Sequence, residues 1–278
     1  MRNYRIAVSS IVVLATANAG LAGSSVVFSD GDFDPADWTT HIFSINSGDG
    51  NGSTHLNGGD PGAYREHEVS VANAPAGERS ISRVVSFRND AVYDPAISGE
   101  VESINWEEGH RFFSGPTFPG AEVVIGVAVL QDEELYLAEA YVQQNPPDWT
   151  NHSGTFIQQN FHRFDPTNRV TGLDFKAKPD FSDKGSPFQI GFFRANATSL
   201  GGNGSSRVYG IDNWAVEIVA VCGLDGDVNN DGSVDLADLN LVLANFGQAS
   251  EAGDTNGDGT VDLADLNAVL AAFGTVCP

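Results

Sequence analysis

Hydrophobic and polar residues alternate in short runs between about Ser24 and Val221 of this 278-residue chain. Typical runs are "SVVFS", "TTHIFSI", "SISRVVSF", "GTFIQQNF" and "PFQIGFF", and clusters of Gly, Asp, Asn and Pro separate them. A period of two residues is the pattern of a half-buried strand, and no long helical period interrupts it. The pattern therefore predicts a mainly β fold, an antiparallel β-sandwich of the jelly-roll type, over residues 23–221.

Two of the predicted strand regions can be examined residue by residue. The run "EVVIGVAVLQDEELYLAEAYV" has two apolar segments around the polar turn Gln131-Asp132-Glu133-Glu134, which predicts a hairpin. In the strand that begins at Ile211, alternation puts Asp212, Trp214 and Val216 on one face. Trp214 is therefore expected in the core and not on a ligand-binding surface.

After Cys222 the pattern changes to a duplicated segment with a helical period. The stretch "GDVNNDGSVDLADLNLVLANFG" returns 27 residues later as "GDTNGDGTVDLADLNAVLAAFG", and 17 of 22 positions are identical. Each copy places apolar residues at helical spacing, and Gly247 and Gly274 are expected to end the two helices. The apolar positions are Leu236, Leu239, Leu243 and Phe246 in the first copy, and Leu263, Leu266, Leu270 and Phe273 in the second. Residues 222–278 are thus predicted to form a second, α-helical domain.

Each copy also carries the ligand spacing of a calcium loop. Oxygen-bearing side chains occupy loop positions 1, 3, 5, 9 and 12, a glycine (Gly232 or Gly259) occupies position 6, and position 7 can offer a main-chain carbonyl. Carboxylates held this close repel one another, and a hard cation that takes six to eight oxygens removes that cost. The predicted ligands of two calcium ions are Asp227, Asn229, Asp231, Ser233, Asp235 and Asp238, and Asp254, Asn256, Asp258, Thr260, Asp262 and Asp265.

The duplicated loop and helix resemble a type I dockerin domain, and neither loop is preceded by the entering helix of a calcium sensor. The resemblance implies two calcium sites related by pseudo-two-fold symmetry and a cohesin module on a scaffold or cell-surface protein as partner. It also implies partner contacts at Leu236-Ala237 and Leu263-Ala264, where many dockerins carry hydroxyl residues. Basic residues, which dockerins often carry further along the helix, are absent from residues 222–278. Core packing of Leu236 and Leu263 remains an equal alternative.

The composition and the N-terminal sequence indicate where the protein is located and disfavour one class of partner. The formal net charge of −23 disfavours nucleic-acid binding, which needs a basic footprint. Residues 1–22 have the charged, apolar and small-residue order of a signal peptide, with cleavage expected after Ala19 or Ala22. No later segment is apolar for long enough to span a membrane. In an exported protein Cys222 and Cys277 are expected to form a disulfide that closes the helical domain.

The sandwich region resembles jelly-roll, concanavalin-like and carbohydrate-binding modules, through "SDGDFDPADWT" near its start and "YGIDNWAVEIV" at its end. The resemblance implies that the first and last strands pair, which would bring Asp30 and Asp32 towards Asp212. Those aspartates either hold a structural calcium or cap turns. A glycan ligand is the leading expectation, and Trp149, in the loop "QNPPDWTNHSG", is the candidate for stacking on a sugar ring.

Catalytic motifs such as HExxH and GxSxG are missing from the sequence. The nearest candidates for a general acid and base are Glu107 with Glu108, and Glu134 with Glu139. Three functions therefore stay open: a non-catalytic glycan-binding protein, an extracellular glycoside hydrolase or lyase, and a structural surface protein. An aromatic groove without paired carboxylates would favour the first, paired carboxyl groups in a groove the second, and a smooth surface the third.

Overall fold

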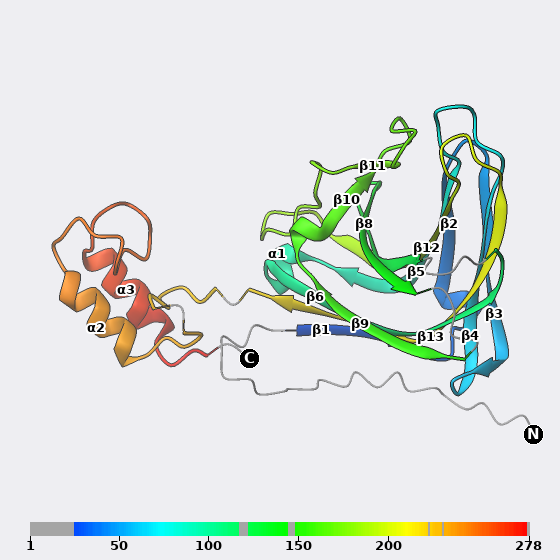
Figure 1. The fold of residues 1–278 in the computed structure, drawn as a ribbon. Coiled ribbons are helices and arrows are strands. Elements are labelled where there is room, and N and C mark those ends of the chain that lie inside the picture. Colours follow the sequence, from blue (N-terminus) through cyan, green and yellow to red (C-terminus); the bar gives the residue numbers. More distant parts are fainter. Residues whose placement is uncertain (1–24, 117–121, 144–147, 222, 230, 277–278) are drawn as a thin grey trace, which may run out of the picture. The chain divides into compact units, whose positions relative to one another are not determined.

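A computed structural model describes residues 25–116, 122–143, 148–221, 223–229 and 231–276 (Figure 1). The chain divides into two compact units. One unit is Phe28–Val219, and the other contains the chain from Ala220 onward. Among the described residues, none of the helices has the length and apolar character that a bilayer-spanning helix requires.

The larger unit is built from two sheets, here called sheet A and sheet B. Sheet A has the strand order β3-β4-β13-β6-β9, and β1 also pairs with β13. The first and last strands of the chain's β region are therefore neighbours, as expected from the sequence. The strands of sheet A are β1 Ser25–Asp30, β3 Gly48–Gly59, β4 Gly62–Val71, β6 Val101–Ser114, β9 Thr150–Phe156 and β13 Ser205–Ala220.

Sheet B has the strand order β11-β10-β8-β7-β12-β5-β2, and its neighbouring strands run antiparallel. The prediction of a mainly β fold with two antiparallel sheets is confirmed. The strands are β2 Trp38–Ile45, β5 Ile81–Tyr93, β7 Glu122–Gln131, β8 Glu134–Gln143, β10 Phe161–Phe164, β11 Leu173–Asp174 and β12 Phe188–Ala197. Short helical turns connect some of them: Pro35–Asp37, α1 Pro95–Ser98 and Gln158–Asn160.

The predicted hairpin is formed by β7 and β8. Gln131 pairs with Glu134, and the two residues between them have left-handed backbone angles, with φ of 52° at Asp132 and 66° at Glu133. This geometry matches the right-handed twist of the two strands, because a two-residue turn of this hand brings them into register. The sequence pattern therefore placed both the strands and the turn correctly.

The main core lies between the two sheets. Trp214 of β13 is 1% exposed, and its ring contacts those of Trp38 and Phe192, with centroids 5.1 and 6.1 Å apart. Val216 and Ile218 are buried with Trp214, as the alternation predicts for that end of the strand. Asp212 is also buried, but Asn213 between it and Trp214 has a left-handed backbone, with φ of 47°, which interrupts the alternation. The core position of Trp214 is confirmed.

The other face of sheet B is concave and carries a second apolar cluster, which includes Val85, Phe87 and Phe193. Phe43 of β2 and Phe164 of β10 lie on strands far apart in the sheet order, yet their ring centroids are 5.6 Å apart. Sheet B is therefore strongly curled (Figure 1). The curl matters for function because it produces a recess on this face.

The smaller unit contains α2 Leu236–Asn245 and α3 Leu263–Ala272. Two residues after each helix comes a glycine in the left-handed conformation, Gly247 and Gly274, close to where the sequence predicted the helices to stop. The two copies exchange main-chain hydrogen bonds. Val234 of the first loop bonds to Gly274 and Thr275, which follow α3. Reciprocally, Val261 of the second loop bonds to Gly247 and Gln248, which follow α2. The loop of each copy thus forms its hydrogen bonds with the residues that follow the helix of the other copy.

Four valines form the centre of this small unit, and all are fully buried: Val234, Val242, Val261 and Val269. The predicted apolar stripe is mostly not part of this core. Leu239 and Leu266 pack against it, but the other predicted positions are 46–64% exposed. Those exposed residues are Leu236, Leu243 and Phe246 on α2, and Leu263, Leu270 and Phe273 on α3.

Candidate functional sites

The two predicted calcium loops share their main internal hydrogen bonds. Asp227 at position 1 accepts from the N–H groups of Asp231 and Gly232, and Asp254 does the same from Asp258 and Gly259. These bonds wrap the loop around its first carboxylate. The sharp turn at position 6 uses a left-handed backbone, with φ of 85° at Gly232, which favours glycine.

The last ligand of each loop fixes the start of the helix that follows. Asp238 is fully buried, and one oxygen accepts from the N–H groups of Val228 and Asn229 while the other accepts from Asp235. Asp235 in turn caps the helix by accepting from the N–H of Ala237. The second copy repeats these roles at Asp265 and Asp262.

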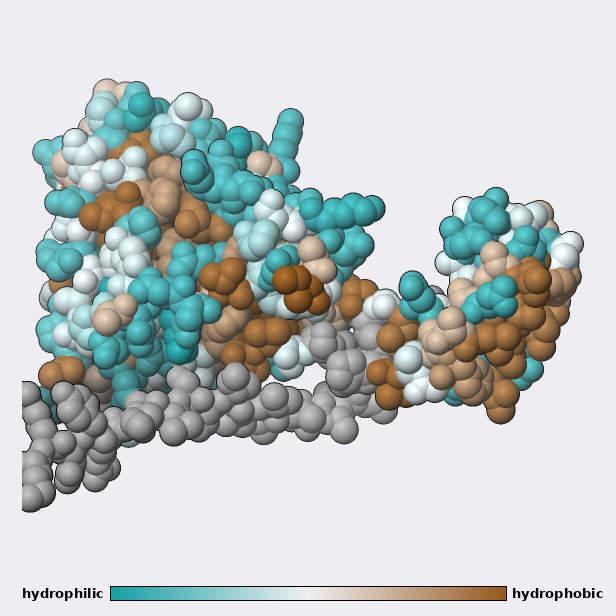
Figure 2. Space-filling model, turned by 180° about the vertical axis from the view of Figure 1, so that it is seen from behind, coloured by the Kyte–Doolittle hydropathy of each residue, from teal (hydrophilic) through white to brown (hydrophobic). Residues whose placement is uncertain are grey.

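This fixed carboxylate explains why the apolar stripe does not face the core. Asp238 must point inward to its loop, and Val242, one turn later, then points inward as well. At about 100° per residue, Leu236 and Leu243 lie roughly 140–160° from Asp238 around the helix, on the opposite side. Of the two open alternatives for Leu236 and Leu263, core packing is therefore wrong. Figure 2 shows hydrophobic residues gathered on one side of the helical unit.

The loops fit a calcium ion in their chemistry. The predicted side-chain ligands are all oxygen atoms. In each carboxylate, at least one oxygen accepts no more than one hydrogen bond, which leaves lone pairs for a cation. In the described part of the chain, no three His, Cys, Asp or Glu side chains converge as metal ligands. The predicted ligands also include an Asn amide oxygen and a main-chain carbonyl, which a group of His, Cys, Asp and Glu side chains does not cover. Calcium binding by these loops therefore stays a proposal.

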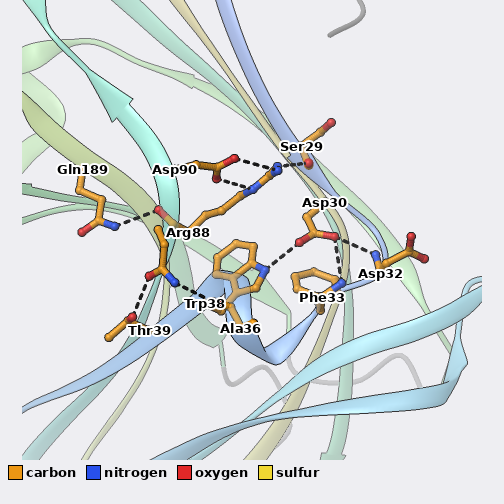
Figure 3. A network of polar contacts seen from close by, with 11 residues as sticks. Ser29, Asp30, Asp32, Phe33, Ala36, Trp38, Thr39, Arg88, Asp90 and Gln189 are labelled. Atoms are coloured by element: carbon orange, nitrogen blue, oxygen red, sulfur yellow. Dashed lines mark hydrogen bonds and ion pairs between the residues drawn. The ribbon is translucent and has the colours of Figure 1, made fainter. Parts of the chain in front are cut away.

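The aspartates near the start of the sandwich serve as turn caps. Asp30 accepts from the N–H groups of Asp32 and Phe33 with one oxygen, and from the indole N–H of Trp38 with the other (Figure 3). Asp212 is buried and accepts from the main-chain N–H groups of Asp60 and Asn213. Burial raises the pKa of Asp212, and these two hydrogen bonds oppose the rise. The turn-cap alternative accounts for these side chains.

The first pair of carboxylate candidates, Glu107 and Glu108, is separated by the sheet itself. These neighbours in β6 point to opposite faces. Glu108 is fully buried in an ion pair with Arg194 of β12, which is also fully buried. Both residues line a pocket of about 320 Å³, but the carboxylate of Glu108 is buried against Arg194 and is not presented to that pocket together with Glu107.

The second pair, Glu134 and Glu139, is also split between the two faces of β8, because the register is unbroken and the residues are an odd number of positions, five, apart. Each meets a different arginine. Glu134 lies 3.7 Å from Arg163, and Glu139 lies 3.3 Å from Arg83. Neither pair of carboxylates is therefore arranged as a general acid with a base.

Trp149 packs on the outer face of sheet A. Its ring centroid lies 5.4 Å from that of Tyr64 and 6.1 Å from that of Phe113, and its indole N–H donates to the carbonyl of Gly58 at 2.9 Å. Gly210 of β13 lies beneath it, where a Cβ atom would come within 2.5 Å of the indole. The structure thus uses Trp149 as an anchor for its loop.

A groove of about 440 Å³ opens on the concave side of sheet B. Apolar side chains form part of its wall, and Phe175, which also lines it, is 53% exposed. Arg83 and Glu139 form an ion pair in the groove, and Arg83 also donates to the carbonyl of Thr171. The lining residues are Arg79, Ile81, Arg83, Val124, Glu139, Val170, Thr171, Leu173, Phe175, Ala195, Asn196, Ala197 and Arg207.

Several polar groups in this groove lack a partner. Asn196 is 2% exposed, and its amide nitrogen donates to the carbonyls of Val69 and Ser205, but its Oδ1 is buried without a donor. The Nε atoms of Arg79 and Arg207 are buried without an acceptor. Such groups are costly unless water or a ligand satisfies them. The lining therefore combines apolar walls with polar groups whose hydrogen-bonding capacity the protein itself does not fill.

Sequence reasoning did not find this groove. Its polar residues come from different strands and are far apart in the chain, so no local spacing reveals them. The one available signal was the scarcity of basic residues, since the whole chain has only 14 Lys and Arg. Each arginine in the β region was therefore a candidate for a structural or binding role. The predicted signal peptide, Cys222 and Cys277 lie outside the described residues, so the signal peptide and the disulfide stay predictions.

No protein-family model matches this chain, and no curated protein matches it either. Among solved structures, it is similar to the family 11 carbohydrate-binding module from Clostridium thermocellum, with 14% identity over 70% of this chain and 96% of that one, at a TM-score of 0.38. The tandem family 22 modules from Paenibacillus barcinonensis match with 10% identity over 73% and 47%, at 0.32. The Lotus tetragonolobus seed lectin matches with 10% identity over 64% and 99%, at 0.27.

Proposed function

We propose that this protein is a secreted, non-catalytic modular protein whose helical unit binds two calcium ions and docks to a cohesin module. The observation that carries the proposal is that positions 1 and 12 accept equivalent main-chain hydrogen bonds in both loops. Calcium would neutralise the crowded carboxylates and hold each loop against its helix.

The exposed leucines and phenylalanines of α2 and α3 support the docking step. Soluble proteins rarely expose large contiguous apolar surfaces, and such surfaces mark interaction sites. Leu236-Ala237 and Leu263-Ala264, the predicted contact pairs, are all exposed. The same exposed face is present twice because the helices are duplicated, so either helix could make the main contact with the cohesin module.

Calcium titration of the full chain by calorimetry tests the first part. Two ions per chain are expected, and Asp227→Ala and Asp254→Ala should each remove one of them. Glu251→Ala is the matched control, since it removes an exposed acidic residue between the two loops that is not a predicted ligand. A single ion, or none, in the unaltered protein would contradict the proposal.

Binding to a panel of type I cohesin modules tests the second part. Leu236→Glu should leave binding nearly intact, and so should Leu263→Glu, whereas the double variant should bind to no module. Leu200→Glu serves as a control because Leu200 is an equally exposed leucine, 54% exposed, on the β-sandwich unit. If one single variant lost all binding, the two helices could not be interchangeable in binding the cohesin module.

For the sandwich unit we propose glycan binding in the groove of sheet B. Sugar hydroxyls both donate and accept hydrogen bonds, and the half-buried side chains of Arg79 and Arg207 in the groove lining carry N–H donors. Phe175 gives an exposed aromatic face for the apolar side of a sugar ring. The separated carboxylates give no support to the hydrolase alternative, and the groove itself argues against a smooth structural surface.

A screen of the full chain against a polysaccharide array, with product release measured in parallel, tests this part. Binding without turnover is expected, and Asn196→Ala should weaken it. Turnover would support the hydrolase or lyase alternative. Absence of binding to every polysaccharide would contradict the proposal.

A further inference from the structure

The groove of sheet B concentrates positive charge in a strongly acidic protein. The chain has a formal net charge of −23 and only 14 Lys and Arg residues, yet Arg79, Arg83 and Arg207 all line this groove. Among the described lining residues, Glu139 is the only carboxylate, and it pairs with Arg83. The lining therefore has an excess of two positive charges.

Those two charges belong to Arg79 and Arg207, for which no salt bridge is found within the described residues. The nearest acidic neighbour of Arg79 in sequence is Glu78, whose carboxylate accepts from the amide of Asn46. Both side chains are half-buried, with an Nε that lacks an acceptor. A half-buried guanidinium without a counter-charge gains most from an anionic ligand, because the local dielectric is lower than that of water.

The chemistry of guanidinium narrows the kind of anion. Arginine presents its N–H groups in a planar fork that matches carboxylate and sulfate oxygens. The rest of the lining is neutral: apolar walls, the exposed ring of Phe175 and the free Oδ1 of Asn196. Such a lining suits a sugar ring that carries the anion, whereas a bare inorganic ion would use only the arginines.

We propose that this groove binds an anionic polysaccharide, one whose sugar units carry carboxylate or sulfate groups. The inference rests on the proposed glycan-binding function of the sandwich and specifies its ligand class. It also gives the arginines a role that a neutral ligand would not require. Elsewhere the acidic surface would repel such a polymer, so attraction must be local to the groove.

Titration of the full chain with three polymers tests the proposal: polygalacturonate, a sulfated galactan and a neutral mixed-linked β-glucan. Binding to at least one of the charged polymers is expected, stronger than to the β-glucan. It should weaken as salt is raised, because screening acts on charge pairs. The two charged polymers separate a carboxylate ligand from a sulfate ligand.

Arg79→Gln and Arg207→Gln should each lower the affinity for the charged polymer about tenfold, as expected for the loss of one charge-assisted contact. Arg111→Gln is the matched control and should change nothing. Arg111 is also half-buried, with an unpartnered Nε, but it lies over the ring of Phe113, away from the groove lining.

The outcomes separate this inference from the function on which it rests. Equal or tighter binding of the neutral β-glucan would overturn the inference and leave glycan binding standing. If the protein bound carboxyl-reduced polygalacturonate as tightly as polygalacturonate itself, the ligand would not be recognised through its carboxylates. Failure to bind any of the three polymers, or any other polysaccharide on an array, would overturn both.

Discussion

The buried ion pair between Arg194 and Glu108 gives the sharpest test of how the sandwich is held together. The two side chains join β12 of sheet B to β6 of sheet A, and both are 0% exposed. Burial raises the pKa of Glu108, and the guanidinium of Arg194 opposes that rise. Replacing Arg194 by Leu would leave a carboxylate in the core without its counter-charge. Removing one partner of such a pair costs about 3–5 kcal/mol.

The cost should appear as a lower melting temperature of the sandwich unit, measured by calorimetry on the full chain. For a unit of this size each kcal/mol lowers the midpoint by about 2–4 °C, so Arg194→Leu should lower it by roughly 6–20 °C. The matched control is Arg163→Leu. Arg163 forms half-exposed ion pairs with Glu134 and Asp174, at 3.7 and 3.2 Å. Exposed pairs contribute at most about 1 kcal/mol.

The pH dependence of the Arg194→Leu variant adds a second readout. A carboxyl group whose folded pKa is raised is protonated in both states at low pH, so its penalty is absent there. The penalty grows as pH rises above the ordinary glutamate pKa and is complete above the folded pKa. The deficit against the unaltered protein should therefore be smaller at pH 4 than at pH 7. Replacing Glu108 by Gln in the same background should remove this extra dependence.

Equal destabilisation by Arg194→Leu and Arg163→Leu would refute the reasoning, because burial would then make no difference. A deficit that did not change with pH would also contradict it, since the penalty would not come from an ionised Glu108.

Burial and the nearby charge of Arg194 lower the pKa of His110 to about 2, so the unfolded chain takes up a proton below pH 6.5 that the folded chain does not. Stability should fall by about 1.4 kcal/mol per pH unit below that point, and urea unfolding of His110→Gln should show a shallower dependence. Gly210→Ala should displace Trp149, at a cost of about 1–3 kcal/mol for overpacking, with a change in tryptophan fluorescence; unchanged emission would contradict the packing. Non-reducing peptide mapping should recover Cys222 joined to Cys277, whereas two free thiols would refute the disulfide.

Much of the site chemistry in the helical unit was determined by the sequence alone. The order of Asp227, Asn229 and Asp231 encodes a loop whose hydrogen bonds span at most five residues at that end. Such local bonds depend on spacing and on one flexible glycine, both of which can be read directly. The same holds for the strands, whose alternation gave the correct face for Trp214 and the correct turn between β7 and β8.

The tertiary structure decided which side of each helix is buried. Helical spacing marks Leu236 and Leu243 as apolar but does not say whether they face a core or a partner. The hydrogen bonds of the buried Asp238 and the reciprocal pairing of the two copies fix the rotation of the helix, and they leave both leucines outside the core. The groove of sheet B was likewise beyond the sequence. Arg79 precedes β5, Asn196 is on β12 of sheet B, and Arg207 is on β13 of sheet A. They meet only through contacts between segments far apart in the chain, which leave no periodic trace in the sequence.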